Sequence, residues 1–311
     1  MTPLADRLKD YFTMRPVPSA LFQISAGYVA GAAYAQKEGR ITQTVLIPLE
    51  RGAVEPSFDR SNIRDAGLLA EVIKEAAGRL KVSDGDVSLL VPDLSSRVFV
   101  LSLDSLPPSR SELENLINWK TKKQMPLLAE DVRFTYEIIK TDKPLRVLVL
   151  LARSSVIKEY ETFFAKLRLN VRIVTIPALQ LMNLGKASRP ADLLVGNIEE
   201  DHIALAVFTD AQLLLYRTKG LSPDRGGPLS AEGVNQLAVE VVNTLRFIED
   251  HEKKKIAAAR LRLGMWEGND ELYRKLEPLL PLPVERIVPE KVAHLDTRER
   301  ELLAPLIGQV P

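Results

Sequence analysis

The sequence of 311 residues contains no cysteine and only three histidines. Without cysteine the chain has no disulfide, no thiolate metal site and no cysteine nucleophile, and this composition fits a reducing compartment. The histidines, His202, His251 and His294, lack the spacing of a zinc site, so we expect each to face solvent or to hydrogen-bond locally. The sequence also lacks the G-x-S-x-G motif of a serine nucleophile. Nothing in it predicts a catalytic residue or a metal site.

A strong net charge and a long apolar run are missing as well. The formal net charge is +1, so no overall field draws the chain to nucleic acid or to an anionic membrane. No window reaches the ~18 consecutive apolar residues of a transmembrane helix. Asp6, Arg7 and Lys9 interrupt any signal peptide. We therefore expect a cytoplasmic protein without a transmembrane segment and without a nucleic-acid partner.

What the sequence does contain is an internal duplication. Hydrophobic residues make up 46% of the chain, enough for a sizeable core. Each half begins with three strand-like runs and continues as helix, strand and helix, which favours two α/β lobes with mixed sheets covered by helices. The runs are 20–25, 28–35 and 42–49 in the first half, and 193–198, 202–208 and 213–217 in the second.

A module without catalytic motifs interrupts the first half. A strand at 98–103 stops at Pro107-Pro108, and Ser111 with Glu114 forms a candidate capping box for a helix that ends at Pro126. Strands at 134–139 and 147–151 complete the module. The predicted domains are an N-terminal tail (1–19), a first lobe (20–97 and 152–190), the inserted module (98–151) and a second lobe (191–311). Small polar residues at 185–192 mark the boundary between the lobes.

This layout resembles the actin-like ATPase superfamily and, within it, the FtsA/PilM branch. The resemblance is most specific in the module, and it extends over about residues 20–290 through the order of the elements. It implies an actin-like fold of duplicated ribonuclease H-like lobes, with a strand–helix–strand–strand subdomain inserted in the first lobe. The module is similar to that of the type IV pilus assembly protein PilM family at Leu106-Pro107-Pro108, Trp119-Lys120, Gln124-Met125-Pro126 and Glu130-Asp131-Val132.

The superfamily binds nucleotide with two D-x-G hairpins and a G-G loop, and all three depart from the pattern here. The amides of Gln23 and Asn197 replace carboxylates near Mg²⁺, a hard cation that prefers anionic oxygen. Glu199 replaces a glycine and would repel phosphate. We therefore expect a pseudo-ATPase without a cofactor, although residual nucleotide binding, or a purely structural role for these polar residues, is equally compatible. The degenerate loop residues are Gln23, Ser25, Ala26, Asn197, Glu199, Gly264 and Gly268.

The resemblance implies a scaffold at the cytoplasmic face of the inner membrane, in a type IV pilus or a related secretion machine. In that family a groove between the first lobe and the module holds the cytoplasmic N-terminal peptide of a PilN-like bitopic protein, and pilus motor ATPases are candidate further partners. From position and residue type, we assign the groove to Val98, Val100, Leu101, Leu103, Leu113, Leu116, Ile117, Trp119 and Lys120.

Two alternatives remain within the fold. An active actin-like ATPase would have carboxylates at positions 23 and 197, where the sequence has Gln23 and Asn197. An FtsA-like cell-division protein would end in a basic amphipathic helix, which residues 298–311 match poorly.

Overall fold

The structure is a computed structural model that describes residues 17–126, 129–140, 144–184, 192–210, 212–221 and 229–310. Most of the predicted N-terminal tail, and the predicted boundary at 185–192 except for residue 192, lie outside these residues. Among the described residues, no helix is long and apolar enough to cross a bilayer.

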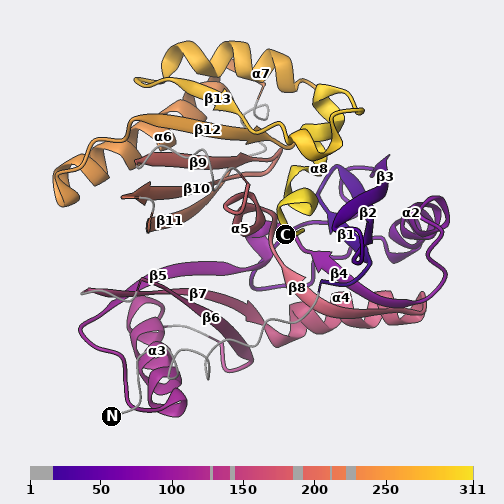
Figure 1. The fold of residues 1–311 in the computed structure, drawn as a ribbon, viewed down its shortest axis with the longest axis horizontal. Helices are drawn as coiled ribbons and strands as arrows, with labels where there is room; N and C mark the ends of the chain where they lie inside the picture. Colours follow the sequence, from indigo (N-terminus) through magenta and orange to yellow (C-terminus); the bar gives the residue numbers. More distant parts are fainter. Residues whose placement is uncertain are drawn as a thin grey trace.

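Two sheets with the same strand order form the lobes (Figure 1). The first has the order β3-β2-β1-β4-β8, with β1 (Ala20–Ile24), β2 (Tyr28–Ala35), β3 (Arg40–Pro48), β4 (Gly85–Leu90) and β8 (Leu169–Thr175). The second has the order β11-β10-β9-β12-β13, with β9 (Leu193–Ile198), β10 (His202–Thr209), β11 (Gln212–Gly220), β12 (Ala258–Leu263) and β13 (Val284–Arg286).

The pairing of strands repeats as well. In each lobe the first three strands form an antiparallel meander, and the last two run parallel to the first strand. Both sheets are covered by helices. Those of the first lobe are α2 (Ala66–Arg79), α4 (Ser154–Lys166) and α5 (Pro177–Leu181), and those that follow second-lobe strands are α6 (Ala231–Glu252), α7 (Asn269–Leu276) and α8 (Thr297–Gly308). Short 3-10 turns are η1 (Asp93–Ser95), η4 (Glu277–Leu279) and η5 (Glu290–Val292). The predicted two-lobe architecture is confirmed.

The final helix of each lobe packs against the other lobe. Helix α5 contacts β9 and β10, α8 contacts β1 and β2, and the two helices touch each other between the lobes (Figure 1). Leu302, Leu306 and Ile307 of α8 are fully buried with Leu21 and Tyr28 of the first sheet. The predicted second lobe, residues 191–311, therefore ends in a helix that completes the core of the first lobe.

The inserted module is a three-stranded sheet, β5-β7-β6, with a helix on one face. Its elements are β5 (Arg97–Leu103), α3 (Arg110–Gln124), β6 (Val132–Lys140) and β7 (Leu145–Arg153). Alternate residues of a strand point to opposite faces. Leu101 and Val149 accordingly pack with Ile117 of α3, whereas Leu148 and Leu150 join the core of the lobes. Figure 1 shows α3 on the outer side of this sheet, away from the lobes.

The predicted cap of α3 is wrong. Ser109 is the N-cap of the helix, and its side chain accepts from the backbone N–H of Glu112, so Ser111 does not form the cap. Helix α4 is capped from outside its own segment. The carboxylate of Asp131, directly before β6, accepts from the backbone N–H and the hydroxyl of Ser155. A cap supplied across a sheet has no local sequence signature.

Candidate functional site

The turns of the β1–β2 and β9–β10 hairpins have the same backbone hydrogen bond. The N–H of Ser25 donates to the carbonyl of Tyr28 at 2.9 Å, and the N–H of Glu199 donates to the carbonyl of His202 at 2.9 Å. The turns also bond to each other across the lobes, because Ser25 Oγ donates to Glu199 Oε2 at 2.9 Å. The space between the hairpins is therefore bridged by side chains.

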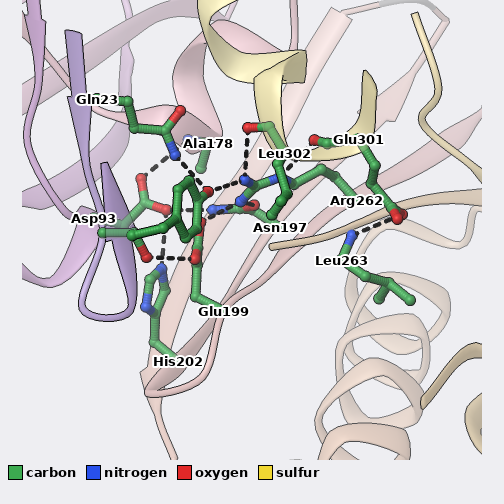
Figure 2. A network of polar contacts seen from close by, with 12 residues as sticks. Gln23, Asp93, Ala178, Asn197, Glu199, His202, Arg262, Leu263, Glu301 and Leu302 are labelled. Atoms are coloured by element: carbon green, nitrogen blue, oxygen red, sulfur yellow. Dashed lines mark hydrogen bonds and ion pairs between the residues drawn. The ribbon is translucent and has the colours of Figure 1, made fainter. Parts of the chain in front are cut away.

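A fully buried arginine lies at the centre of this bridge. Arg262 of β12 donates from Nη1 to the carboxylate of Glu199 and to Asn197 Oδ1, the latter at 2.9 Å (Figure 2). Its Nη2 donates to the Tyr28 hydroxyl of the first lobe. Gln23 Nε2 donates to the same hydroxyl at 2.9 Å. One guanidinium thus connects both degenerate hairpins.

The remaining guanidinium hydrogens are taken by helix α8. Pro305 lies inside α8 and has no N–H, so the carbonyl of Glu301, four residues earlier, lacks its helical donor. Arg262 Nε donates to this carbonyl at 3.1 Å, and Nη2 donates to the carbonyl of Leu302 at 3.1 Å. Two backbone carbonyls of α8, the helix between the lobes, therefore accept hydrogen bonds from Arg262.

The Glu301 side chain is held by a second cation and by backbone. Arg286 Nη2 pairs with Glu301 Oε2 at 2.5 Å, and the N–H of Leu263 donates to Oε1 at 3.1 Å. Burial raises the pKa of Glu301, while the hydrogen bond from Arg286 opposes the rise. Burial likewise raises the pKa of Glu199 against the pull of Arg262. Each carboxylate depends on its arginine to stay ionised.

A second buried cluster joins the lobes at Asp93 of η1 (Figure 2). Its Oδ2 accepts from Asn197 Nδ2 at 2.7 Å and from His202 Nε2 at 3.0 Å. Its Oδ1 accepts from the N–H of Ala178 at the start of α5, at 3.0 Å. Asn197 therefore gives its N–H to a carboxylate and takes a hydrogen from a guanidinium, which an amide can do and a carboxylate cannot.

His202 corrects the expectation that the histidines are exposed or only locally bonded. It is 2% exposed, and its Nδ1 lies 2.6 Å from Asp201 Oδ1. Burial lowers the pKa of His202, but the carboxylates of Asp201 and Asp93 outweigh burial and raise it to about 10. Its two ring nitrogens then both donate to carboxylates.

The two glycines predicted in the third loop serve internal contacts. A Cβ at Gly264 would overlap the Arg262 guanidinium and the Glu199 carboxylate, so this glycine serves the close approach of an internal ion pair. Gly268 is the N-cap of α7 with φ +82°, a left-handed conformation that glycine adopts without strain. Among the described residues, no group of His, Asp and Glu side chains is arranged to hold a metal ion.

The predicted loop residues therefore come together only in part. Asn197, Glu199 and Gly264 lie against Arg262, while Ser25 joins them through Glu199 and Gln23 through Tyr28. Ala26 is half-buried in the first turn and Gly268 lies at α7.

Sequence reasoning missed Arg262, Asp93 and Glu301. The available signal for Arg262 was a charged residue inside the apolar strand 258–263.

A cavity of about 810 Å³ lies between the module and both lobes. It is bounded by the lobe-facing side of the module sheet, by β8 and α5 of the first lobe, and by β10 and β11 of the second. Strands β6 and β8, which both contribute to its wall, are edge strands of their sheets. Glu137 is the charged residue among the described residues that line it. The apolar lining includes Ile139, Leu148, Leu150, Ile173, Leu179 and Leu213.

The groove residues assigned from sequence lie elsewhere. Val98 is buried with the core of the lobes, and Leu116 is half-buried against α3's own sheet. The apolar face of α3 is used to cover the module, so it cannot also face the lobes. Leu101, Leu103, Leu113 and Ile117 form that covered core. Val100, Leu101, Trp119 and Lys120 line a separate hollow outside the cavity.

Comparison with known proteins places this geometry in one fold. Neither a protein-family model nor a curated protein sequence matches the chain. Among solved structures, the PilM-PilN type IV pilus biogenesis complex contains a chain with a TM-score of 0.76 at 15% identity, over 94% of this chain and 98% of that one.

Two further solved structures are more distant. An actin-like ATPase fold protein of unknown function from Bacteroides thetaiotaomicron has a TM-score of 0.52 at 12% identity, over 92% of this chain and 94% of that one. The cytoplasmic domain of EpsL, an inner membrane component of the type II secretion system of Vibrio cholerae, has a TM-score of 0.51 at 10% identity, over 93% and 94%. The chain therefore has the actin-like ATPase fold in the form found in PilM.

Proposed function

We propose that this chain is a cytoplasmic scaffold of a type IV pilus or related secretion machine, and that it binds an extended peptide in the 810 Å³ cavity. The observation that carries the proposal is the cavity itself, which has apolar walls and two edge strands. The solved structures with this fold include a PilM-PilN complex and a component of a type II secretion system, which supports the same reading.

The cavity suits a peptide in an extended conformation. An edge strand presents backbone N–H and C=O groups that another strand can pair with. Ile173 of β8 and Ile139 of β6 lie at such edges, and Leu150 and Leu213 supply apolar surface between them. Backbone pairing then provides affinity, and the apolar walls select alternate side chains of the peptide.

We propose that the partner is the cytoplasmic N-terminal peptide of a PilN-like bitopic membrane protein. Cytoplasmic segments next to a transmembrane helix are rich in Lys and Arg. Glu137 is exposed among the lining residues, so it offers an opposite charge to a basic residue of such a peptide. This complementarity would raise the association rate more than the final affinity.

We further propose that the scaffold works without nucleotide. In place of phosphate and Mg²⁺, the hairpins bond to Arg262, and Arg262 bonds to α8. The lobes are thereby linked by the protein's own cation. This arrangement supports a pseudo-ATPase in which the peptide cavity, whose wall comes from both lobes, is always formed.

Calorimetry with a synthetic peptide tests the peptide site. The peptide is the cytoplasmic N-terminal segment of a PilN-like bitopic protein from the same organism. Leu150→Asp places a charge in the apolar wall and is expected to weaken binding at least ~100-fold, since burying an unpaired charge costs several kcal/mol. Leu116→Asp is the matched control, because Leu116 is also half-buried but lies on the α3 side of the sheet. Equal loss in both variants, with unchanged thermal unfolding, would contradict the site.

The alternative function, a nucleotide-binding ATPase, has its own test. Mg·ATP at 100 times its dissociation constant stabilises a protein by about 2.7 kcal/mol. We expect no shift in thermal unfolding with Mg·ATP and no phosphate release. A shift accompanied by turnover would establish the alternative.

A further inference from the structure

A second hollow lies at the β5 edge of the module, beside the end of α3. It has a volume of about 550 Å³ and is formed by Val100 and Ser102 of β5 together with Trp119, Lys120 and Lys123 of α3. None of these residues lines the larger cavity. Figure 1 shows α3 on the side of the module sheet that faces away from both lobes.

Trp119 is the exceptional residue of this hollow. Its side chain is 58% exposed, and the Lys123 ammonium lies 5.6 Å from the centre of its ring. The fold gains little from an indole in that position. Tryptophan is, by contrast, enriched among the residues that dominate binding energy at protein interfaces, where its ring is desolvated in a pocket.

The hollow is positively charged. Lys120 and Lys123 line it, Lys122 is exposed on the same turn of α3, and no carboxylate belongs to the lining described. Lysines at the end of a helix complement its dipole, which explains the charges but not the exposed indole beside them. In the first turns of α3, Glu114 is already paired with Arg110 at 2.8 Å.

The shape distinguishes a peptide from a membrane surface. Val100, Leu101 and Ser102 are consecutive residues of β5, and β5 is an edge strand of the module sheet. The hollow therefore combines a recess with an exposed indole and two lysines, which an apolar side chain and its flanking carboxylates can enter. A bilayer offers no protruding side chain to fill such a recess.

We propose that this hollow, defined by Trp119, Lys120 and Lys123 beside β5, is a docking site for a short acidic segment of a second protein. An apolar side chain of the segment packs against the Trp119 ring, and its carboxylates pair with the two lysines. The site lies apart from the larger cavity, so the scaffold can hold two partners at once. The proposal does not depend on the peptide proposed for the larger cavity.

Fluorescence anisotropy with two labelled probes tests the proposal. The acidic probe is the peptide Glu-Leu-Asp-Phe-Glu-Leu-Asp, and the basic probe is Lys-Leu-Lys-Phe-Lys-Leu-Lys. We expect the acidic probe to bind, with an affinity that falls as salt is raised, and the basic probe to bind at least tenfold more weakly. Equal binding of both probes, or no binding of the acidic one, would overturn the site.

Substitutions locate the binding. Lys120→Glu with Lys123→Glu, and separately Trp119→Ala, should each weaken the acidic probe at least tenfold. Lys158→Glu with Lys166→Glu makes the same charge change on exposed positions of α4 and should leave binding within twofold. Loss in the control pair as well would show a general charge effect and overturn the site.

A vesicle-binding experiment tests whether the hollow binds an anionic membrane instead of a protein. Vesicles of phosphatidylglycerol and phosphatidylcholine are sedimented with the protein. Binding to the vesicles that Trp119→Ala abolishes, without binding of the acidic probe, would assign the hollow to an anionic membrane and contradict a protein partner. Because Trp119, Lys120 and Lys123 are not in the module core, thermal unfolding of the variants should match that of the parent chain.

Discussion

The Nε atom of Arg262 lies 3.1 Å from the carbonyl oxygen of Glu301, the acceptor that Pro305 leaves without a helical donor. A proline inside a helix ordinarily costs ~3 kcal/mol or more because a backbone hydrogen bond is lost. Here a buried guanidinium from another element supplies that hydrogen bond. The same guanidinium donates to Glu199, Asn197 and Tyr28. Arg262 therefore connects helix α8, at the position that Pro305 leaves without a donor, to both hairpins.

Removal of the arginine should destabilise the chain strongly. Arg262→Ala leaves the buried carboxylate of Glu199 without its cation, and breaking a buried ion pair in this way typically costs about 3–5 kcal/mol. Urea unfolding measures the loss. Arg79→Ala removes an exposed pair with Glu75 and should cost less than ~1 kcal/mol. A similar small loss at both positions would contradict the role given to Arg262.

The space left by that substitution should accept a free guanidinium ion. In Arg262→Ala, methylguanidinium at millimolar concentration should raise the thermal unfolding temperature, because a ligand that binds only the folded state stabilises it. The parent chain should not respond, since Arg262 fills the position. Ammonium at the same ionic strength is the control for a general salt effect.

Restoring the superfamily carboxylate should weaken the fold and not create an ATPase. In Asn197→Asp, a carboxylate would face Asp93 Oδ2, which now accepts a hydrogen bond from Asn197 at 2.7 Å. We expect a loss of about 2 kcal/mol in unfolding free energy, the size of a hydrogen bond to a charged group. Asn170→Asp is a matched control, because exposed Asn170 donates to Asp86 at 2.6 Å. Phosphate release by Gln23→Asp with Asn197→Asp would contradict the account.

His202 should make the stability fall as the medium becomes alkaline. Its pKa is about 10 in the folded chain against 6.5 for the free side chain, so the folded state holds the proton more tightly. The stabilisation is complete below pH 6.5 and is lost as pH rises through 10. The difference in unfolding free energy between the parent and His202→Gln should therefore shrink from pH 6 to pH 10. A difference that grows with pH would be inconsistent with a charged His202.

Reversing the charge at the cavity should slow peptide association. Glu137→Lys places a cation among the residues that line the cavity, and a charge at the edge of a site acts mainly on the association rate and its salt dependence. We expect a decrease of about tenfold in the association rate at low salt, measured by stopped-flow fluorescence. Glu161→Lys, on an exposed position of α4, should have no comparable effect.

The sequence was sufficient to predict the fold because the signals of the fold are local. Apolar periodicity located the strands and helices of both lobes, and their repeated order gave the architecture. The polar site around Arg262 between the lobes was only partly predictable. Hairpin residues such as Asn197 could be aligned with a known pattern, but Arg262 meets Tyr28 across 234 positions of the chain. No spacing rule reveals such a contact.

The residues that line the cavity were not predictable for a different reason. Leu113 and Ile117 have the spacing of an amphipathic helix, but spacing does not say which sheet face the helix covers. In the structure α3 covers the outer face. The lobe-facing surface is then made by Leu148 and Leu150 of β7, whose strand reads as a continuous apolar run because both of its faces are buried.

Our central proposal is that the cavity is formed without nucleotide, because Arg262 links the two lobes through Asn197 and Tyr28. The direct measurement is calorimetric titration of the chain with the N-terminal peptide of a PilN-like bitopic protein from the same organism, carried out with and without Mg·ATP. The account predicts a dissociation constant that is the same within twofold under both conditions. A peptide that binds only in the presence of Mg·ATP would contradict it.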